Sequence, residues 1–386
     1  MAQKRHLLAD IALKGLAIAP SQICGAIRIV PLLRSQVRGD LRLFKRSYQD
    51  DLTVVDVGNA SYLSYVPHGL VMSWSDNGEP VVAYGGQFQK RDGKALHGSC
   101  GSVKLMHRMA KREQGNQLRF LPLHLAMEGF LSLYFKGPEI AWQEYSRYAK
   151  SHGLGSRWEW TASGRAIAGL EDAIRMFEIH EGQVGVLLFV AGALASAFVV
   201  PTPEDYRVLH RSLLEDFYSE LIFQYACIYD GPSPMSCSID ERSVKTLADL
   251  RRGVTQMRTD WAEFQGFMAE GLLDRALKSQ IVYTTNSFFL QRFITDLDPH
   301  AENYIGEAIV RENGELEYLK TYCLSASQTK WVYLLSQLAE HNWNLAATAA
   351  ALNTTLDELV KRLEKAGFGY LINQQVREQV TKRMKS

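Results

Sequence analysis

The sequence predicts an α+β fold, with a mixed sheet-and-helix N-terminal body and a small all-α module at the C-terminus. Three observations support this prediction. The most apolar stretch, residues 177–226, reads as a strand hairpin that leads into a helix. The pairs Asn77-Gly78 and Asn313-Gly314 predict two further hairpins, because both residue types tolerate positive φ. After residue 325 the chain alternates short helical patterns with turns.

Residues 184–200 carry no charge, which raises the question of a membrane span. We interpret them as two buried strands, Val184–Val190 and Ala193–Val200, because β-branched and aromatic residues suit a packed sheet. The turn at Ala191-Gly192 has the glycine that a tight reversal favours. These residues therefore predict the core of a soluble domain.

A helix should follow this hairpin. Thr202 is a good N-cap and Pro203 suits the first helical position. Apolar residues then recur at helical spacing as far as Tyr225. The hairpin and this helix are the best-defined part of the predicted body.

The other predicted elements have weaker patterns. In chain order they are a short N-terminal amphipathic helix, a strand at Ala26–Leu33, β-rich residues 52–90, a basic helix at Val103–Glu113, a strand at Leu118–Leu123, and helical stretches at 124–135, 138–151 and 243–295. We divide the chain into a body (residues 1–240), a helical connector (241–300), a β-hairpin linker (301–324) and a C-terminal module with a basic tail (325–386).

Composition places the protein among ordinary globular chains. Of its 386 residues, 46% are hydrophobic and 22% charged, which allows two or three domains. Residues 1–48 carry nine Lys/Arg against two Asp/Glu, and residues 360–386 carry seven against two, although the whole chain has a net charge of only +1. The basic ends could favour a polyanion, although charge of this kind is more often a solubility feature. The five cysteines form no CxxC pair, which favours the reducing cytoplasm and argues against a zinc site or a disulfide framework.

The C-terminal module carries a recognisable spacing. Its helices should run to about His341, from Asn344 to Ala351 and from Thr355 to Ala366. The spacing resembles the Fis-type helix-turn-helix found at the end of many bacterial regulators. The resemblance covers about a tenth of the chain, and the matching residues are Asn344, Ala349, Ala350, Leu352, Leu359, Leu363 and Gly367.

This resemblance implies that the third helix enters the DNA major groove. Leu356, Asp357 and Glu358 depart from the basic and hydroxyl residues usual there, and the carboxylates would repel phosphates. Two interpretations therefore stay open: the module recognises a DNA sequence, or it is a weak or repurposed version of the motif. The candidate DNA contacts are Thr354, Lys361, Arg362 and Lys365, with Arg377, Lys382 and Arg383 in the tail.

A second resemblance concerns the body. Residues 181–186, Ala191-Gly192 and residues 213–218 are similar to the end of the ARPP-type domains, which are named for association with ADP-ribosylglycohydrolases and rhodanese-like phosphatases. Upstream, residues 121–129 and 84–90 match in pattern, so the likeness covers residues 25–230. It implies a context of ADP-ribose or nucleotide-linked metabolism, and it implies no particular reaction.

Few side chains suggest chemistry. His68 lies in a predicted turn, and His124 and Glu128 share a helical face on which they could act as acid and base. The more common explanation is a partly buried histidine bonded to a carboxylate. Lys104, Arg108 and Lys111 would form a basic stripe suited to phosphate, or an ordinary solvated face. Common nucleotide-hydrolase, dehydrogenase, zinc-protease and serine-hydrolase motifs are absent from the sequence.

Two functions remain from different classes. We favour a non-catalytic cytoplasmic regulator or adaptor, whose body binds a ligand or partner and whose C-terminal module docks on DNA or on a partner protein. The alternative is an enzyme or sensor acting on ADP-ribose or another nucleotide-type substrate, with catalytic candidates His68, His124 and Glu128. No cofactor and no metal is expected. The partners left open are DNA, a partner protein, a nucleotide-type small molecule and a second copy in a homodimer, with no membrane.

Overall fold

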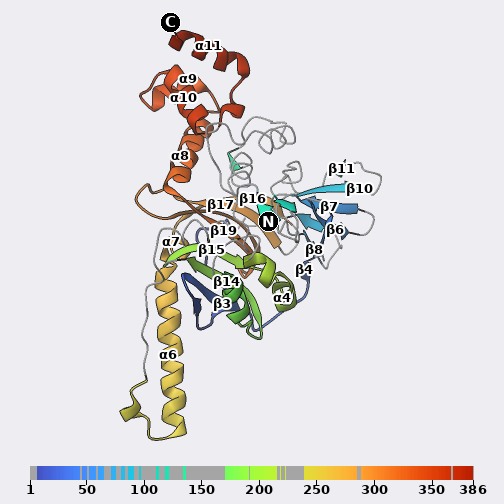
Figure 1. Cartoon of the computed structure of the whole chain (residues 1–386), viewed down its shortest axis with the longest axis vertical. Helices are drawn as coiled ribbons and strands as arrows, with labels where there is room; N and C mark the ends of the chain where they lie inside the picture. The colour runs from blue at the N-terminus through green and yellow to red at the C-terminus, as the bar shows by residue number, and fades with distance from the viewer. Residues whose placement is uncertain are drawn as a thin grey trace, which may run out of the picture. The chain divides into compact units, whose positions relative to one another are not determined.

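The computed structural model divides into two compact units (Figure 1). Unit 1 comprises residues 1–44, 71–81 and 162–324, and unit 2 comprises residues 45–70, 82–161 and 325–386. The structure describes residues 7–43, 46–49, 52–57, 60–64, 71–74, 80–82, 86–90, 95–96, 110–112, 118–120, 134–135, 170–190, 192–214, 218, 222, 239–284, 288–366 and 368–385.

A nine-stranded antiparallel sheet forms the centre of unit 1, which confirms the predicted α+β class. Its strands run in the order β1-β3-β14-β15-β19-β18-β17-β16, and β2 pairs with β3. Their bounds are β1 Ala17–Ile18, β2 Gln22–Cys24, β3 Ile27–Leu33, β14 Gln183–Val190, β15 Ala193–Val199, β16 Leu277–Thr284, β17 Phe288–Thr295, β18 Asn303–Arg311 and β19 Leu316–Leu324.

The predicted hairpin lies in the middle of this sheet. Strands β14 and β15 pair in antiparallel register and are almost wholly buried. Helix α4, Pro203–Ser212, follows with Thr202 as its N-cap, whose side chain accepts a hydrogen bond from Asp205 N at 3.2 Å. The hairpin and the helix start are therefore confirmed. The predicted helical residues beyond 214 lie outside the described part, apart from residues 218 and 222.

Strands β18 and β19 confirm the second Asn-Gly hairpin, with Gly314 at a φ of +82° in the turn. Both strands lie inside the nine-stranded sheet rather than beyond its edge. Every residue of the two strands is buried, which agrees with their central position in the sheet.

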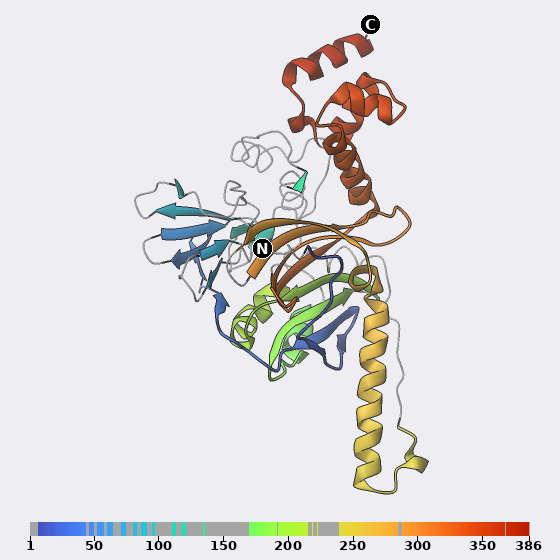
Figure 2. The same ribbon diagram turned by 180° about the vertical axis from the view of Figure 1, so that it is seen from behind.

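Residues 277–295 correct an expectation. They form β16 and β17, where the sequence predicted a continuous helical pattern as far as residue 295. Only the first part of that region is helical, as α6 Leu247–Met268 and α7 Glu270–Leu273. β-branched and aromatic residues such as Ile281 and Phe289 favour strands. Pairing of β16 with β17, and of β17 with β18, holds both segments in the sheet. Helix α6 extends away from the sheet of unit 1 (Figure 2).

The N-terminal helix expectation is also wrong for the described residues. Residues 8–16 run irregularly across the sheet instead of coiling. Leu277 N donates to Ala9 O at 2.8 Å, and Leu316 N donates to Lys14 O at 3.2 Å. Two carbonyl groups of this segment are therefore bonded to residues far along the chain, which offsets part of the loss of helical bonds.

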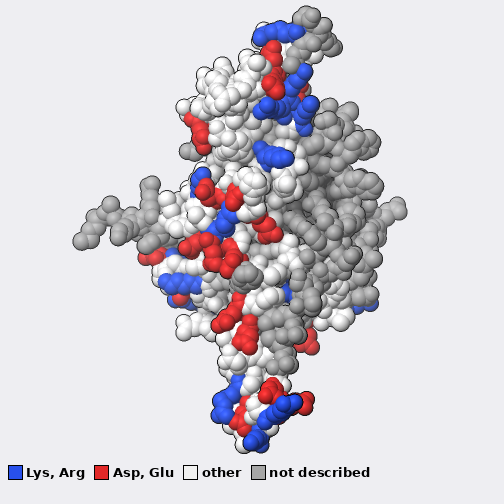
Figure 3. All heavy atoms as spheres, turned by 90° about the vertical axis from the view of Figure 1, so that its left-hand side faces the viewer, with Lys and Arg blue, Asp and Glu red and all other residues white. Residues whose placement is uncertain are grey.

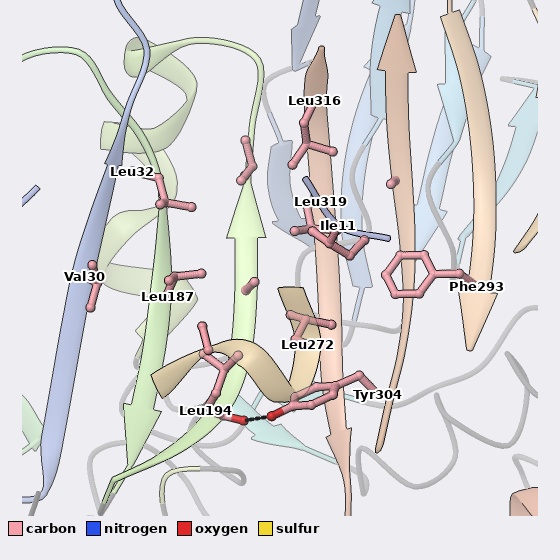
Figure 4. Close-up of a cluster of buried hydrophobic side chains, with 14 of the residues drawn as sticks. Ile11, Val30, Leu32, Leu187, Leu194, Leu272, Phe293, Tyr304, Leu316 and Leu319 are labelled. Carbon is pink, nitrogen blue, oxygen red and sulfur yellow. Dashed lines mark hydrogen bonds between the residues drawn. The ribbon is translucent and has the colours of Figure 1, made fainter. Parts of the chain in front are cut away.

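One face of the sheet carries the core of unit 1 (Figure 4). Side chains from both halves of the sheet meet there, together with Ile11 from the irregular segment and Leu272 from α7. Tyr304 OH donates to Leu194 O at 2.9 Å, so its buried hydroxyl is satisfied within this core. The same core joins strands that are more than 250 residues apart in the sequence.

Smaller elements complete the described structure. A separate three-stranded sheet has the order β4-β8-β9, so β8 and β9 flank the predicted Asn77-Gly78 turn as neighbours. The remaining elements are β4 Leu41–Leu43, β5 Arg46–Gln49, β6 Leu52–Val57, β7 Ala60–Ser64, β8 Val71–Trp74, β9 Pro80–Val82, β10 Gly86–Lys90, β11 Ala95–Leu96, β12 Ala110–Arg112, β13 Leu118–Phe120, α3 Leu170–Met176 and the 3₁₀ turn η5 Glu241–Ser243.

The C-terminal helices belong to unit 2. They are α8 Ala326–Glu340, α9 Leu345–Ala351, α10 Leu356–Lys365 and α11 Gln374–Lys385, with a 3₁₀ turn, η6, at Gly369–Leu371. Ser325 and Gln328 form a reciprocal capping box at the start of α8. None of the helices in the described residues is both long and apolar enough to cross a bilayer.

Candidate functional site

A hollow of about 480 Å³ lies where strand β3 leaves the sheet of unit 1. Three chain segments line it: Gly15–Ala17, Leu33–Ser35 and Glu181. They converge because β1 and β14 pair with β3 on either side, and Arg34 N donates to Gly182 O at 2.8 Å. Gly15 and Gly182 adopt φ values of +86° and +74°, which favour glycine. This volume suits a small ligand.

Arg34 connects the hollow to a buried ionic chain, which consists of Arg34, Glu317, Arg311 and Asp40. Arg34 Nη1 donates to Glu317 Oε2 at 2.5 Å, and Arg34 Nη2 donates to Leu316 O at 2.6 Å. Arg311 pairs with the other oxygen of Glu317 and, through both terminal nitrogens, with Asp40. Its guanidinium also lies 4.6 Å from the centre of the Phe288 ring. The four charges alternate in sign, so each has an opposite neighbour.

In this ionic chain, burial disfavours the charged forms of the side chains, whereas ion pairing favours them. Burial lowers the pKa of Arg34, although Glu317 favours its charged form. Burial also disfavours the charge on Arg311, but hydrogen bonds to Asp40 and Glu317 outweigh it and raise the Arg311 pKa. The pKa of Asp40 is lowered, because the Arg311 hydrogen bond outweighs the effect of burial. Pairing therefore favours the charged forms of Arg311 and Asp40.

A second buried polar pair lies in α4. Tyr206 OH and His210 Nδ1 are 2.8 Å apart, and the rings meet edge to face. Burial lowers the pKa of His210 to about 4, so this imidazole is neutral at physiological pH. The neutral imidazole and its buried hydroxyl partner therefore help α4 to pack against β14.

The helix pair α9 and α10 presents charged side chains of a different kind. The helices are joined by residues 352–355, with Asn353 at a φ of +50°. Asn344 and Thr355 cap the two helices by accepting hydrogen bonds from Ala347 N and Glu358 N. The buried face of α10 consists of Leu359, Val360 and Leu363. Its opposite face is therefore left for solvent or a partner.

The four candidate DNA contacts lie together on this exposed side. Lys361, Arg362 and Lys365 are exposed, and Thr354 is half-buried at the end of the turn. Glu358 accepts a hydrogen bond from Thr354 Oγ1 at 2.8 Å and pairs with Arg362 at 3.3 Å, and these contacts lower its pKa. Asp357 pairs with Arg383 at 3.5 Å. Basic and acidic side chains lie side by side on the C-terminal helices (Figure 3).

Lys111 is the one catalytic or phosphate candidate that lies within the described residues. His68, His124, Glu128, Lys104 and Arg108 all lie outside the described residues. Across the described ranges, no group of three His, Cys, Asp or Glu side chains is placed to hold a metal ion.

Lys111 requires a correction. It lies in strand β12, which pairs with β13, whereas the sequence predicted a basic helix from Val103 to Glu113. A helical stripe of Lys104, Arg108 and Lys111 therefore does not extend through residues 110–112. Gly115 and Asn116 between the two strands favour a hairpin turn, which explains the difference.

Sequence reasoning missed the hollow and the ionic chain. Arg34 directly follows a strand that the sequence predicted correctly, and Glu181 precedes a glycine at the start of the hairpin. However, Arg34 lies 283 positions from Glu317, and Asp40 lies 271 positions from Arg311, so no local pattern connects the two halves of the ionic chain.

Comparisons with known proteins place most of the chain in one family. The ARPP-2 family model matches residues 11–286, so this chain is a member of the ARPP-2 family. No curated protein and no solved structure matches the chain. The matched range ends before β17, although β17, β18 and β19 complete the nine-stranded sheet. Helices α8 to α11 lie entirely beyond it.

Proposed function

We propose that this protein is a non-catalytic cytoplasmic regulator or adaptor whose helices α9 and α10 form a Fis-type helix-turn-helix that docks on DNA. The observation that carries the proposal is the exposed basic face of α10. Lys361, Arg362 and Lys365 lie on it, while the apolar side chains of the helix are buried. Such a face can contact phosphates without disturbing the packing beneath it.

The acidic residues at the start of α10 limit what this surface can do. Asp357 and Glu358 would repel phosphates if they acted alone. Their pairing with Arg383 and Arg362 reduces this repulsion, but it also occupies part of the basic charge. The proposed contact is therefore a backbone-directed, salt-sensitive one, with Lys361 and Lys365 contributing most.

The cytoplasmic assignment is supported by the thiols. Cys24 is a free thiol in the described structure, and the sequence offers no CxxC pair. Free thiols are usual where the surroundings are reducing. In this proposal the body of the protein binds a ligand or a partner, and the C-terminal helices contact DNA.

Fluorescence anisotropy with a labelled DNA duplex tests the proposal. We expect the full-length protein to bind with an affinity that falls as salt rises, and deletion of residues 325–386 to abolish binding. The triple substitution Lys361→Gln, Arg362→Gln, Lys365→Gln should weaken binding at least tenfold. Lys330→Gln is the matched control, because Lys330 is exposed on α8. Full binding by the truncated protein would refute the proposal.

A further inference from the structure

Helix α6 carries a narrow apolar seam with the spacing of a coiled coil. Apolar residues recur along it at alternating intervals of three and four, which places them at positions a and d of successive heptads. They are Leu247, Leu250, Val254, Met257, Trp261, Phe264 and Met268. A helix that packs only on its own sheet usually has a wider apolar stripe, whereas a strict a/d seam suits a second helix lying along it.

The two ends of this seam have different surroundings. At the C-terminal end, Met268 packs against the core of unit 1. At the N-terminal end, α6 extends away from the sheet, and the side chains of Leu247 and Leu250 are 74% and 41% exposed (Figures 1 and 2). Val254 and Met257 between them are half-buried. The core of unit 1 therefore explains the last part of the seam and leaves the first part unexplained.

The two flanks of the exposed part differ in charge. Arg251 and Arg258 occupy position e, are both exposed, and form no ion pair with any residue that the structure describes. Gly253 and Asp260 occupy position g on the other flank, where Ile239 lies beside Gly253. Charges at positions e and g select the partner of a coiled-coil helix. An incoming helix would therefore gain most from carboxylates on the side that meets the two arginines.

A second copy of α6 fits this surface less well. In an antiparallel pair, position e of one helix faces position e of the other, so Arg251 and Arg258 of the two copies would repel each other. In a parallel pair in register, the two Met268 side chains would have to meet, although each already packs in the core of its own unit 1. Both pairings conflict with the surroundings of the seam.

From these observations we infer that residues 247–258 dock an amphipathic helix of a partner protein, with apolar residues at positions a and d and Asp or Glu beside Arg251 and Arg258. The apolar side chains of the partner would cover Leu247 and Leu250 and remove them from water. Its carboxylates would pair with the two arginines and select the partner by charge. The docking segment is about 18 Å long at the rise of an α-helix, which suits a transient contact.

This docking surface would supply the partner of the proposed regulator or adaptor, and it rests on that proposal for its biological role. The test contains no DNA, so the two proposals can fail separately. The probe is a fluorescently labelled three-heptad peptide with leucine at positions a and d and glutamate at e and g. A second peptide has lysine at e and g. The like charges keep each peptide from pairing with itself.

Fluorescence anisotropy with the full-length protein measures the binding. We expect saturable binding of the glutamate peptide, at least tenfold tighter than that of the lysine peptide. The double substitution Leu247→Ser, Leu250→Ser should weaken this binding at least tenfold. The matched control is Thr255→Ser, Thr259→Ser, because both threonines are exposed on the same helix but lie off the seam. This control should bind as the unmodified protein does.

The arginines are tested by the preference between the two peptides. Arg251→Gln, Arg258→Gln should reduce the preference for glutamate at least fivefold. Arg252→Gln should preserve it, because Arg252 lies at position f and pairs with Asp249. All the substituted side chains are exposed, and far-ultraviolet circular dichroism checks that each variant is folded.

Three results would overturn the inference. The first is no saturable binding of the glutamate peptide, or equal binding of the two peptides. The second is unchanged binding in the variant with both leucines replaced. The third is a dimer of the unmodified protein in sedimentation that Leu247→Ser, Leu250→Ser dissociates, because a second copy would then cover the seam.

Discussion

The nine-stranded sheet of unit 1 holds charged side chains in its interior, whereas the C-terminal helices hold theirs on the surface. Arg34, Arg311 and Glu317 are each at least 90% buried and share short hydrogen bonds. Arg362 and Glu358 form a pair in which both side chains are more than half exposed. Buried pairs of the first kind fix a structure, because losing one partner leaves a charge without compensation. Exposed pairs of the second kind add little stability and leave their charges available to a partner.

Glu317→Gln should have the largest effect, because it removes the negative charge between two buried arginines and replaces one of its two acceptor oxygens with a donor. We expect the free energy of unfolding to fall by about 3–5 kcal/mol. Denaturant unfolding measures the change. Glu358→Gln is the matched substitution in the C-terminal helices and should leave Tm unchanged. Equal losses of stability in the two variants would contradict the difference between buried and exposed ion pairs.

Gly185→Ala tests how closely the strands of the sheet pack. A Cβ at this position would lie 2.2 Å from Phe198 O and 3.0 Å from Val199 Cα, both backbone atoms that cannot move independently. We expect a loss of about 3 kcal/mol in the free energy of unfolding. Gly25→Ala has no atom within 4 Å of the new Cβ and should cost about 1 kcal/mol, from its positive φ alone. If Gly185→Ala is as mild as this control, the register of β14 and β15 is incorrect.

His210 should make the stability of unit 1 depend on pH. Its folded pKa is about 4, below the ordinary value of 6.5, so between these values the unfolded chain binds the additional proton. Stability should therefore fall as pH drops from 6.5 to 4, by on the order of 3 kcal/mol. His210→Gln should flatten this part of the profile in denaturant unfolding, whereas His300→Gln, at an exposed position, should not. An unchanged profile in His210→Gln would show that this ring is not held neutral.

Glu358→Gln should have the smallest effect of these variants. The expected effect is a change in DNA affinity. The substitution removes a negative charge near the expected phosphates and releases Arg362 from its ion pair. We expect binding to tighten about twofold to fivefold at low salt, measured by anisotropy. Weaker binding would mean that Glu358 contributes to the contact.

The sequence could predict elements whose signals are local. The β14–β15 hairpin, the Thr202 cap and the Gly314 turn each depend on residues within a short window. The same holds for the spacing of α9 and α10.

Features that depend on distant partners could not be predicted in this way. Strand β16 carries polar residues such as Lys278 and Gln280, and it becomes a strand through pairing with β17. Residues 8–16 are irregular because strands far along the chain take their hydrogen bonds. The ionic chain joins residues from opposite ends of the sequence, and the hollow exists only once β1, β3 and β14 have paired.

The salt dependence of DNA binding tests the central contrast most directly. The logarithm of the binding constant should fall linearly with the logarithm of salt concentration, with a slope of about −0.9 for each phosphate contact. Replacing Lys361, Arg362 and Lys365 with glutamine should reduce the size of this slope by about 2 to 3, while Lys330→Gln should leave it unchanged. A slope near zero for the unmodified protein, or the same slope in the triple variant, would contradict the proposal that the exposed charges of α10 contact DNA.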